Sequence, residues 1–208
     1  TQGESQYPGA ISTTVKRLID EKKGDDIEDE GGLFLGVCSN YLCDLKVGDE
    51  VKVSGPNGKR FLLPSNPSDH NFLFIATGTG IAPFRGMIME LLKESPSSKI
   101  DLVMGVPFNA DLIYDSYFTS LSNEGLIGYH KAISREEDDG KDRGCYTDQR
   151  IERSIDFFKP ILKDEKTLVY LCGILGMEDG FYKMLKRNKL DGPYLKLDEV
   201  ALKTEESE

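Results

Sequence analysis

The feature that most constrains the fold is an unbroken apolar run, NFLFIA, at residues 71–76. A short run of this kind, without alternating polar residues, is typical of a strand buried on both faces of a sheet. A helical pattern follows at residues 83–94, and the alternation of strand and helix continues to residue 187. The further expected strands lie at residues 99–106, 128–134 and 167–174, and the further expected helices at 111–121, 148–162 and 177–187. This order predicts an α/β domain with a doubly wound parallel sheet.

The sequence before Pro64 has a different rhythm. Residues 11–19 form a β-branched, partly alternating run, and a highly charged segment that suits a surface loop follows it. Short apolar pieces then continue to Pro64, separated by glycine, proline and asparagine pairs that suit tight turns. We therefore expect an antiparallel β region up to about residue 65, with domains at residues 1–66 and 67–208.

Charge and cysteine content exclude several classes of protein. The chain has 36 acidic and 26 basic residues, a net charge of −10, which argues against nucleic acid or an anionic membrane as a partner. No apolar run approaches the roughly eighteen residues of a membrane span, so we expect none. Four scattered cysteines do not form the framework of a small secreted domain, so we expect reduced thiols in the cytoplasm. Cys38 and Cys43 have no second close pair to complete a metal site, so we expect no metal.

The glycine-rich segment ATGTGIAPFR, at residues 76–85, lies between the first buried strand and the helix after it. Gly78 and Gly80 let the backbone approach a pyrophosphate, the helix N-terminus supplies free N–H groups, and Pro83 suits a first helical turn. The segment departs from the dinucleotide fingerprint G-x-G-x-x-G, because Pro83 holds the sixth position. By themselves these residues are equally consistent with a phosphate-binding turn and with a plain strand-to-helix turn.

Two further segments carry groups that suit ligands. GVCSNYL, at residues 36–42, has a hydroxyl, an amide and backbone N–H groups, which suit either a phosphate-holding turn or a plain helix cap. YLCGILGME, at residues 170–178, ends the last expected strand, where open α/β sheets place their ligands. Cys172 in this segment is either a reactive thiol or a small buried hydrophobe, and the latter is commoner for its residue type.

Together and in this order, these segments resemble the plant-type ferredoxin-NADP reductase family. The resemblance runs from Val15 to Glu178 and includes GVPFNADLIY at residues 105–114 and ISREE at residues 133–137. It implies that the β region is the C-terminal part of an antiparallel β-barrel that binds FAD, and that the α/β region binds NADP(H). It also implies that hydride passes between NADP(H) and FAD, and single electrons to ferredoxin or a flavodoxin-like acceptor. In a photosynthetic eukaryote the implied compartment is the plastid stroma.

On the flavin side, the resemblance implies two groups of contacts. The residues that would hold the FAD pyrophosphate are Gly36, Val37, Cys38 and Ser39. The residues that would flank the cofactor are Thr14, Val15 and Lys16. The family's Arg-x-Tyr-Ser strand, which also binds the flavin, would precede Thr1, so we expect the sequence to be a piece of a longer protein.

On the nicotinamide side, the resemblance implies contacts from several loops. The glycine-rich turn would contribute Gly78, Thr79 and Gly80, with Thr79 between flavin and nicotinamide. The adenosine end would be bound by Val106 and Pro107 at a turn, by Ser134 and Arg135 at the 2′-phosphate, and by Tyr146 against the adenine. The nicotinamide would be lined by Cys172, Gly173 and Ile174. Cys172 is the candidate active-site residue, with a thiol that helps to set the ring and attacks nothing.

Two positions near the implied 2′-phosphate site depart from the family pattern. Gly144 and Asp148 stand where the family tends to have lysine and glutamine. The lost cation and the gained carboxylate weaken a preference for NADPH unless Arg143 or Arg150 compensates, and we still predict NADPH over NADH. Two other functions stay open, namely a nucleotide-binding regulatory or electron-docking module without stable FAD, and the reductase arm of an oxygenase system.

Overall fold

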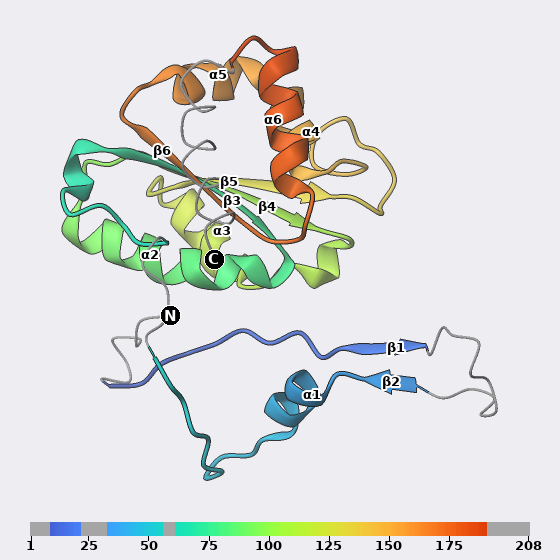
Figure 1. Ribbon diagram of the computed structural model, residues 1–208. Helices are drawn as coiled ribbons and strands as arrows, with labels where there is room; N and C mark the ends of the chain where they lie inside the picture. The colour runs from blue at the N-terminus through green and yellow to red at the C-terminus, as the bar shows by residue number, and fades with distance from the viewer. Residues whose placement is uncertain (1–8, 22–32, 56–60, 191–208) are drawn as a thin grey trace, which may run out of the picture. The chain divides into compact units, whose positions relative to one another are not determined.

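The structure is a computed structural model that describes residues 9–21, 33–55 and 61–190 (Figure 1). The chain divides into two compact units, Thr1–Leu62 and Leu63–Glu208, and each is described by itself. The domain boundaries expected from the sequence stay a prediction. Within the described ranges, no helix is both long and apolar enough to cross a membrane. The same ranges hold no cluster of three or more histidine, cysteine or acidic side chains that could bind a metal.

Unit 2 is built on a parallel sheet with the strand order β5-β4-β3-β6. The strands are β3 (Asn71–Thr77), β4 (Ile100–Val106), β5 (Gly128–Ile133) and β6 (Thr167–Cys172). The helices are α2 (Ile81–Glu94), α3 (Asp115–Asn123), α4 (Thr147–Arg153), α5 (Ile155–Lys163) and α6 (Met177–Arg187). Three short 3-10 turns join them, namely η1 (Pro67–Asp69), η2 (Gly78–Gly80) and η3 (Asn109–Asp111). The predicted doubly wound α/β fold is confirmed.

The apolar run in β3 is unbroken because helices cover both faces of the sheet. Phe72, Phe74 and Ala76 belong to the core formed with α2 and α3. Leu73 and Ile75 belong to the opposite core, formed with α4, α5 and α6. These two groups of helices lie on opposite sides of the sheet (Figure 1). Since successive strand residues face opposite ways, a strand at the centre of such a sheet must be apolar at every position.

The path of the chain reverses beside β3. It runs from β3 outward to β4 and β5, then crosses back to β6 on the other side of β3. The carboxyl ends of β3 and β6 therefore diverge into different helices, α2 and α6. In open α/β sheets a crevice at such a switch point is where ligands bind.

Unit 1 contains a short antiparallel pair, β1 (Ile19–Glu21) and β2 (Leu33–Leu35), and the helix α1 (Val37–Asp44). The expectation of an all-β region is wrong for α1. The expected strand at residues 11–19 is reduced to its last residue, which begins β1, and the described residues of 45–65 form no strand. The residue before β1 bonds to the start of α1 instead of to a further strand, because Leu18 pairs with Gly36, Ser39 and Asn40.

Candidate functional site

The carboxyl ends of β3 and β6 are joined directly at the switch point. The backbone N–H of Ile174 donates to the Thr77 hydroxyl oxygen at 2.9 Å. A methyl group added at Gly80 would overlap the backbone carbonyl of Cys172, and one added at Gly173 would overlap the Thr77 side chain. Glycine is therefore required in both segments where the residues after β3 meet the residues after β6. We call this meeting point the crossing. The structure thus brings the predicted turn at residues 78–80 against the predicted segment at residues 172–174.

This crossing offers backbone groups that suit a diphosphate. The η2 turn leads into α2, a helix of fourteen residues with no acidic side chain in its first turn. The first N–H groups of a helix have no acceptor within the helix, and they carry partial positive charge. Gly78 has a φ of 52°, and a side chain there would point into open space. The residues present therefore fit the pyrophosphate of a dinucleotide.

Cys172 ends β6 and is half-buried. Burial raises the pKa of its thiol, so the thiol stays protonated and is a poor nucleophile. The rim beyond it is apolar, because the Ile174 side chain is 67% exposed. The chemistry of this position suits a group that contacts a ring rather than one that attacks it.

The expected adenosine-binding residues lie along the same edge of the sheet, past the ends of β4 and β5. The Ser134 N–H donates to the Val106 carbonyl at 3.0 Å, and the Arg135 N–H donates to the Pro107 carbonyl at 2.9 Å. Backbone hydrogen bonding between the chain segments of β4 and β5 thus continues past the strand ends, through the residues predicted to bind the adenosine end. Tyr146 directly precedes α4, and its side chain is 62% exposed.

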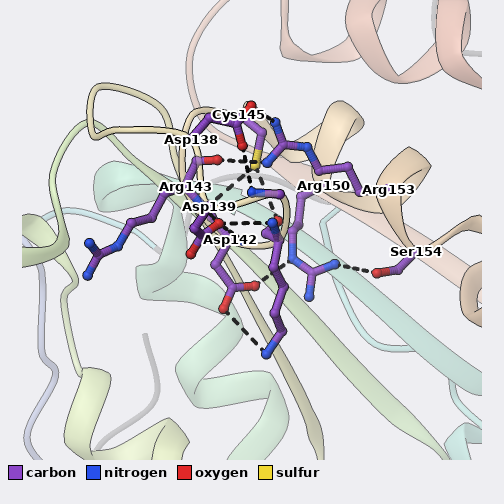
Figure 2. Close-up of polar contacts among 10 residues, drawn as sticks. Asp138, Asp139, Asp142, Arg143, Cys145, Arg150, Arg153 and Ser154 are labelled. Carbon is purple, nitrogen blue, oxygen red and sulfur yellow. Dashed lines mark hydrogen bonds and ion pairs between the residues drawn. The ribbon is translucent and has the colours of Figure 1, made fainter.

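A network of arginines and aspartates holds the loop that joins Arg135 to Tyr146, and the sequence interpretation missed it (Figure 2). Arg153 donates to the Asp138 carboxylate at 2.8 Å and to the Arg143 carbonyl at 2.7 Å. Asp139 accepts hydrogen bonds from the backbone N–H groups of residues 141, 142 and 143, each at 2.9 Å. These bonds, that from Arg143 above all, lower the pKa of Asp139 below its ordinary value. The sequence signal for this network is the high density of aspartates shortly before the two arginines of α4.

The arginines named as substitutes for the missing lysine are engaged elsewhere. Arg150 is buried, with its side chain 5% exposed, and pairs with Asp142. Arg143 pairs with Glu136 at 3.2 Å. Arg135 is exposed, and the described residues supply no ion pair for it. Arg135 is therefore available to an anionic ligand, as is Lys141 of the same loop, whose side chain is 74% exposed.

The backbone at Gly144 leaves no room for the lysine that the resemblance implies at this position. Its φ is 65°, a conformation that favours glycine, and an added Cβ would lie 2.8 Å from both Cα and Cβ of Asp138. Asp148 lies on α4 beside α6, because a methyl group at Gly180 would be 3.3 Å from its carboxylate carbon. The two positions that depart from the family pattern thus have different surroundings. Gly144 lies in the loop, and Asp148 lies where α4 contacts α6.

In unit 1, the turn at the start of α1 is tied to the residues before β1. The Gly36 N–H donates to the Leu18 carbonyl at 3.0 Å, and the Ser39 hydroxyl accepts from the Leu18 N–H at 3.1 Å. Asn40 donates its amide to the carbonyl of Leu18 at 2.9 Å and to that of Gly36 at 2.8 Å. The structure therefore holds the predicted segment at the start of α1 against Leu18, which lies two residues after the predicted Lys16.

The remaining flavin-side residues differ in exposure. Thr14 and Val15 are half-buried, and Lys16 is exposed. Val37, at the first position of α1, is 87% exposed, and Cys38 is exposed as well. The N-terminus of α1 is thus open, and its first N–H groups fit a phosphate.

Known proteins resemble this chain in sequence and in fold. Residues 74–183 match the family described as the oxidoreductase NAD-binding domain. The chain is 42% identical over 194 residues to the chloroplastic root-type ferredoxin-NADP reductase of Nicotiana tabacum, covering 89% of this chain and 50% of that protein. It is 37% identical over 183 residues to the cyanelle enzyme of Cyanophora paradoxa, covering 85% of this chain and 48% of that one. The chain thus spans about half the length of these relatives.

The solved structures agree on the fold. The ferredoxin-NADP+ reductase of Plasmodium falciparum superposes with a TM-score of 0.65 at 24% identity, covering 81% of this chain and 62% of that one. Structural similarity at this sequence identity supports the fold, and the sequence matches support the family. The chain belongs to the plant-type ferredoxin-NADP reductase family, and it contains the NAD-binding domain with part of the region that precedes it.

Proposed function

We propose that this chain binds NADP(H) in a flavoprotein reductase that passes hydride between NADP(H) and FAD. Single electrons would then pass to ferredoxin or a similar acceptor, as in a ferredoxin-NADP reductase. The observation that carries the proposal is the crossing of β3 and β6, where Gly80 and Gly173 bring two backbone segments into direct contact. Such a crossing at a topological switch point is suited to a dinucleotide, and the family relationship supports the same ligand.

The residues at the crossing have distinct roles in this proposal. Gly78, Thr79 and Gly80 hold the pyrophosphate at the start of α2, because their backbone can approach it closely. Cys172, Gly173 and Ile174 line the nicotinamide, and the protonated Cys172 thiol orients the ring without bonding to it. When bound, the nicotinamide and the flavin supply the hydride chemistry, and the protein supplies position and exclusion of water.

At the adenosine end, we propose that the chain prefers NADPH to NADH. Val106 and Pro107 form the turn beneath the adenosine, and Tyr146 stacks on the adenine. Ser134 and Arg135 bind the 2′-phosphate, because a hydroxyl and a guanidinium together suit a phosphate dianion. The exposed position of Arg135 supports this role.

FAD is proposed to bind at unit 1. Gly36, Val37, Cys38 and Ser39 at the start of α1 hold its pyrophosphate, and the segment Thr14, Val15 and Lys16 flanks it. The open N-terminus of α1 supports this assignment. Relatives named as chloroplastic or cyanelle proteins favour a plastid over the cytoplasm as the compartment.

Anaerobic addition of NADPH to the protein, supplied with FAD and followed by absorbance, tests the proposal. We expect the visible flavin band to bleach, faster with NADPH than with NADH at equal concentration. Arg135→Ala should slow the reaction with NADPH and leave that with NADH nearly unchanged, since only NADPH has the 2′-phosphate. Flavin that binds but does not bleach with either dinucleotide would contradict the proposal.

A second candidate is a nucleotide-binding module without stable FAD. The small extent of regular structure in the described part of unit 1, a two-stranded sheet and α1, favours it. Equilibrium dialysis with FAD separates the two functions. A protein that binds 2′,5′-ADP but retains no flavin would support the module and not the reductase.

A further inference from the structure

The buried side chain of Arg150 joins parts of unit 2 that the proposed adenosine site uses. Its Nε donates to the Asp142 carboxylate at 2.8 Å, and its Nη1 donates to the Ser154 hydroxyl at 2.7 Å (Figure 2). Arg150 lies on α4 and Asp142 lies in the preceding loop. A guanidinium that is buried and bonded at both ends is held in one orientation.

Asp142 in turn is fixed to the end of β5. Its carbonyl oxygen accepts from the Ile133 N–H at 2.7 Å, and the Gly144 N–H donates to the Ile133 carbonyl at the same distance. Ile133 and Arg143 form a parallel bridge between these bonds. Ile133 directly precedes Ser134 and Arg135, so the backbone that Arg150 holds through Asp142 also positions the proposed 2′-phosphate pair.

The same residue is bonded to the other half of the site. The Arg150 N–H donates to the Tyr146 carbonyl at 2.8 Å in the first turn of α4. The Gln149 side chain accepts from the Tyr146 N–H at 2.9 Å and caps the same turn. The residue proposed to stack on the adenine is therefore fixed to the helix from which Arg150 reaches the loop.

We propose that Arg150 is a positioning residue for the adenosine 2′-phosphate site, and that its pair with Asp142 sets Ser134 and Arg135 relative to Tyr146. Arg150 does not bind the phosphate itself, because its side chain is 5% exposed and its donors are directed to Asp142 and Ser154. This inference rests on the proposed function, since it assumes that these residues bind the adenosine end of NADP(H).

Calorimetric titration of the 208-residue chain with two probes tests the role. The probes are 2′,5′-ADP and 5′-AMP, which differ by the 2′-phosphate, and the quantity measured is the ratio of their Kd values. We expect Arg150→Met and Asp142→Asn each to lower the preference for 2′,5′-ADP about tenfold, as losing a residue that orients ligand-binding groups commonly does. Arg150→Lys should restore most of the preference, because a lysine can still pair with Asp142.

Arg187→Met is the matched control. Arg187 pairs with Glu152 of α4 at 2.8 Å, but the pair lies on the exposed side of α4 and α6. Its loss should leave the Kd ratio unchanged. A fall in the ratio as large as that of Arg150→Met would overturn the inference, because the effect would not be specific to the pair with Asp142.

The outcomes separate this inference from the proposed function. If the unaltered chain shows no preference for 2′,5′-ADP, the proposed function fails and the inference fails with it. If the chain shows the preference and Asp142→Asn keeps it, the inference fails and the proposed function stands. A loss of affinity that is equal for both probes would also overturn it, because general loosening of α4 does not act on the 2′-phosphate alone. Should Arg150→Met not fold, Asp142→Asn decides.

Discussion

Gly144 and Gly140 lie in the same loop and both have positive φ, of 65° and 73°. They differ in their surroundings, because a Cβ at Gly144 would meet Asp138 at 2.8 Å whereas one at Gly140 would meet nothing within 4 Å. The pair therefore separates the cost of backbone conformation from the cost of overlap. Glycine is needed at position 144 for its backbone conformation and to avoid overlap, and at position 140 for its backbone conformation alone.

We expect Gly140→Ala to lower the free energy of unfolding by about 1 kcal/mol, the usual cost of a left-handed conformation for alanine. Gly144→Ala should cost more, by roughly a further 1–3 kcal/mol, because the added methyl group overlaps the backbone of Asp138. Urea denaturation of the two variants measures the difference. Equal losses would show that the loop relaxes away from Asp138.

Asp139 makes the order of this loop depend on pH. Its folded-state pKa is depressed, so its contribution is complete above the ordinary aspartate value of 3.8 and is lost as the pH falls through the lower folded-state value. We expect amide exchange at residues 141, 142 and 143 to accelerate in that acidic range, after correction for intrinsic rates.

Asp139→Asn is the control for this titration, because the amide keeps an acceptor oxygen but does not ionise. Its exchange rates at these amides should show no step in the same range. Identical pH profiles for the variant and the unaltered protein would contradict the role given to Asp139.

At the scale of secondary-structure elements, the contact between β3 and β6 leaves no space at Gly80. We expect Gly80→Ala to lower the free energy of unfolding by about 1–3 kcal/mol, since a backbone carbonyl cannot rotate away as a side chain can. Gly78→Ala is the control, with a positive φ and open space around it, and should cost about 1 kcal/mol. Thermal unfolding compares the variants, and a milder effect at Gly80 than at Gly78 would argue against the tight crossing.

The elements of unit 2 could be predicted because each has a local signal. An unbroken apolar run indicated β3, a helical pattern indicated α2, and the alternation of strand and helix indicated β4 and α6. The helix α1 was not predicted as a helix, since it has only eight residues and none of them is buried in the described part of unit 1. At its first turn the Ser39 hydroxyl accepts from the Leu18 N–H and the Asn40 amide donates to the Gly36 carbonyl, contacts that leave no periodic pattern in the sequence.

The candidate site was predictable where its residues follow strands. Residues 78–80, 106–107, 134–135 and 172–174 all lie at the carboxyl edge of one sheet, as the strand order requires. The pairs of Arg150 with Asp142 and of Arg153 with Asp138 were not predictable, because a side-chain pairing between a loop and a helix leaves no pattern in the sequence. Several aspartates were available to each arginine.

At the scale of the whole molecule, the two units differ in how they bury apolar side chains. Unit 2 has a core on each face of its sheet, whereas unit 1 exposes large apolar side chains that include Val37, Val47 and Val53. In this chain by itself, these exposed side chains offer apolar surface to a small apolar probe.

We expect the chain to bind the dye ANS at neutral pH without denaturant, because the dye fluoresces on exposed apolar surface. Replacing Val37, Val47 and Val53 with threonine should lower the fluorescence, since threonine keeps the shape and adds a hydroxyl. Addition of 2′,5′-ADP, whose proposed site is in unit 2, should leave the signal unchanged. Fluorescence that is insensitive to the three substitutions would place the apolar surface elsewhere.

The overlap between Gly144 and Asp138 also limits how this chain could change its coenzyme specificity over evolutionary time. A lysine at position 144 would meet both the Cα and the Cβ of Asp138, so shortening the side chain at 138 removes only part of the obstacle. Arg153 would lose its partner in the same step. A lysine at position 144 would therefore require the backbone around residue 138 to shift, so a change of coenzyme specificity by this route is coupled to the packing of the whole loop.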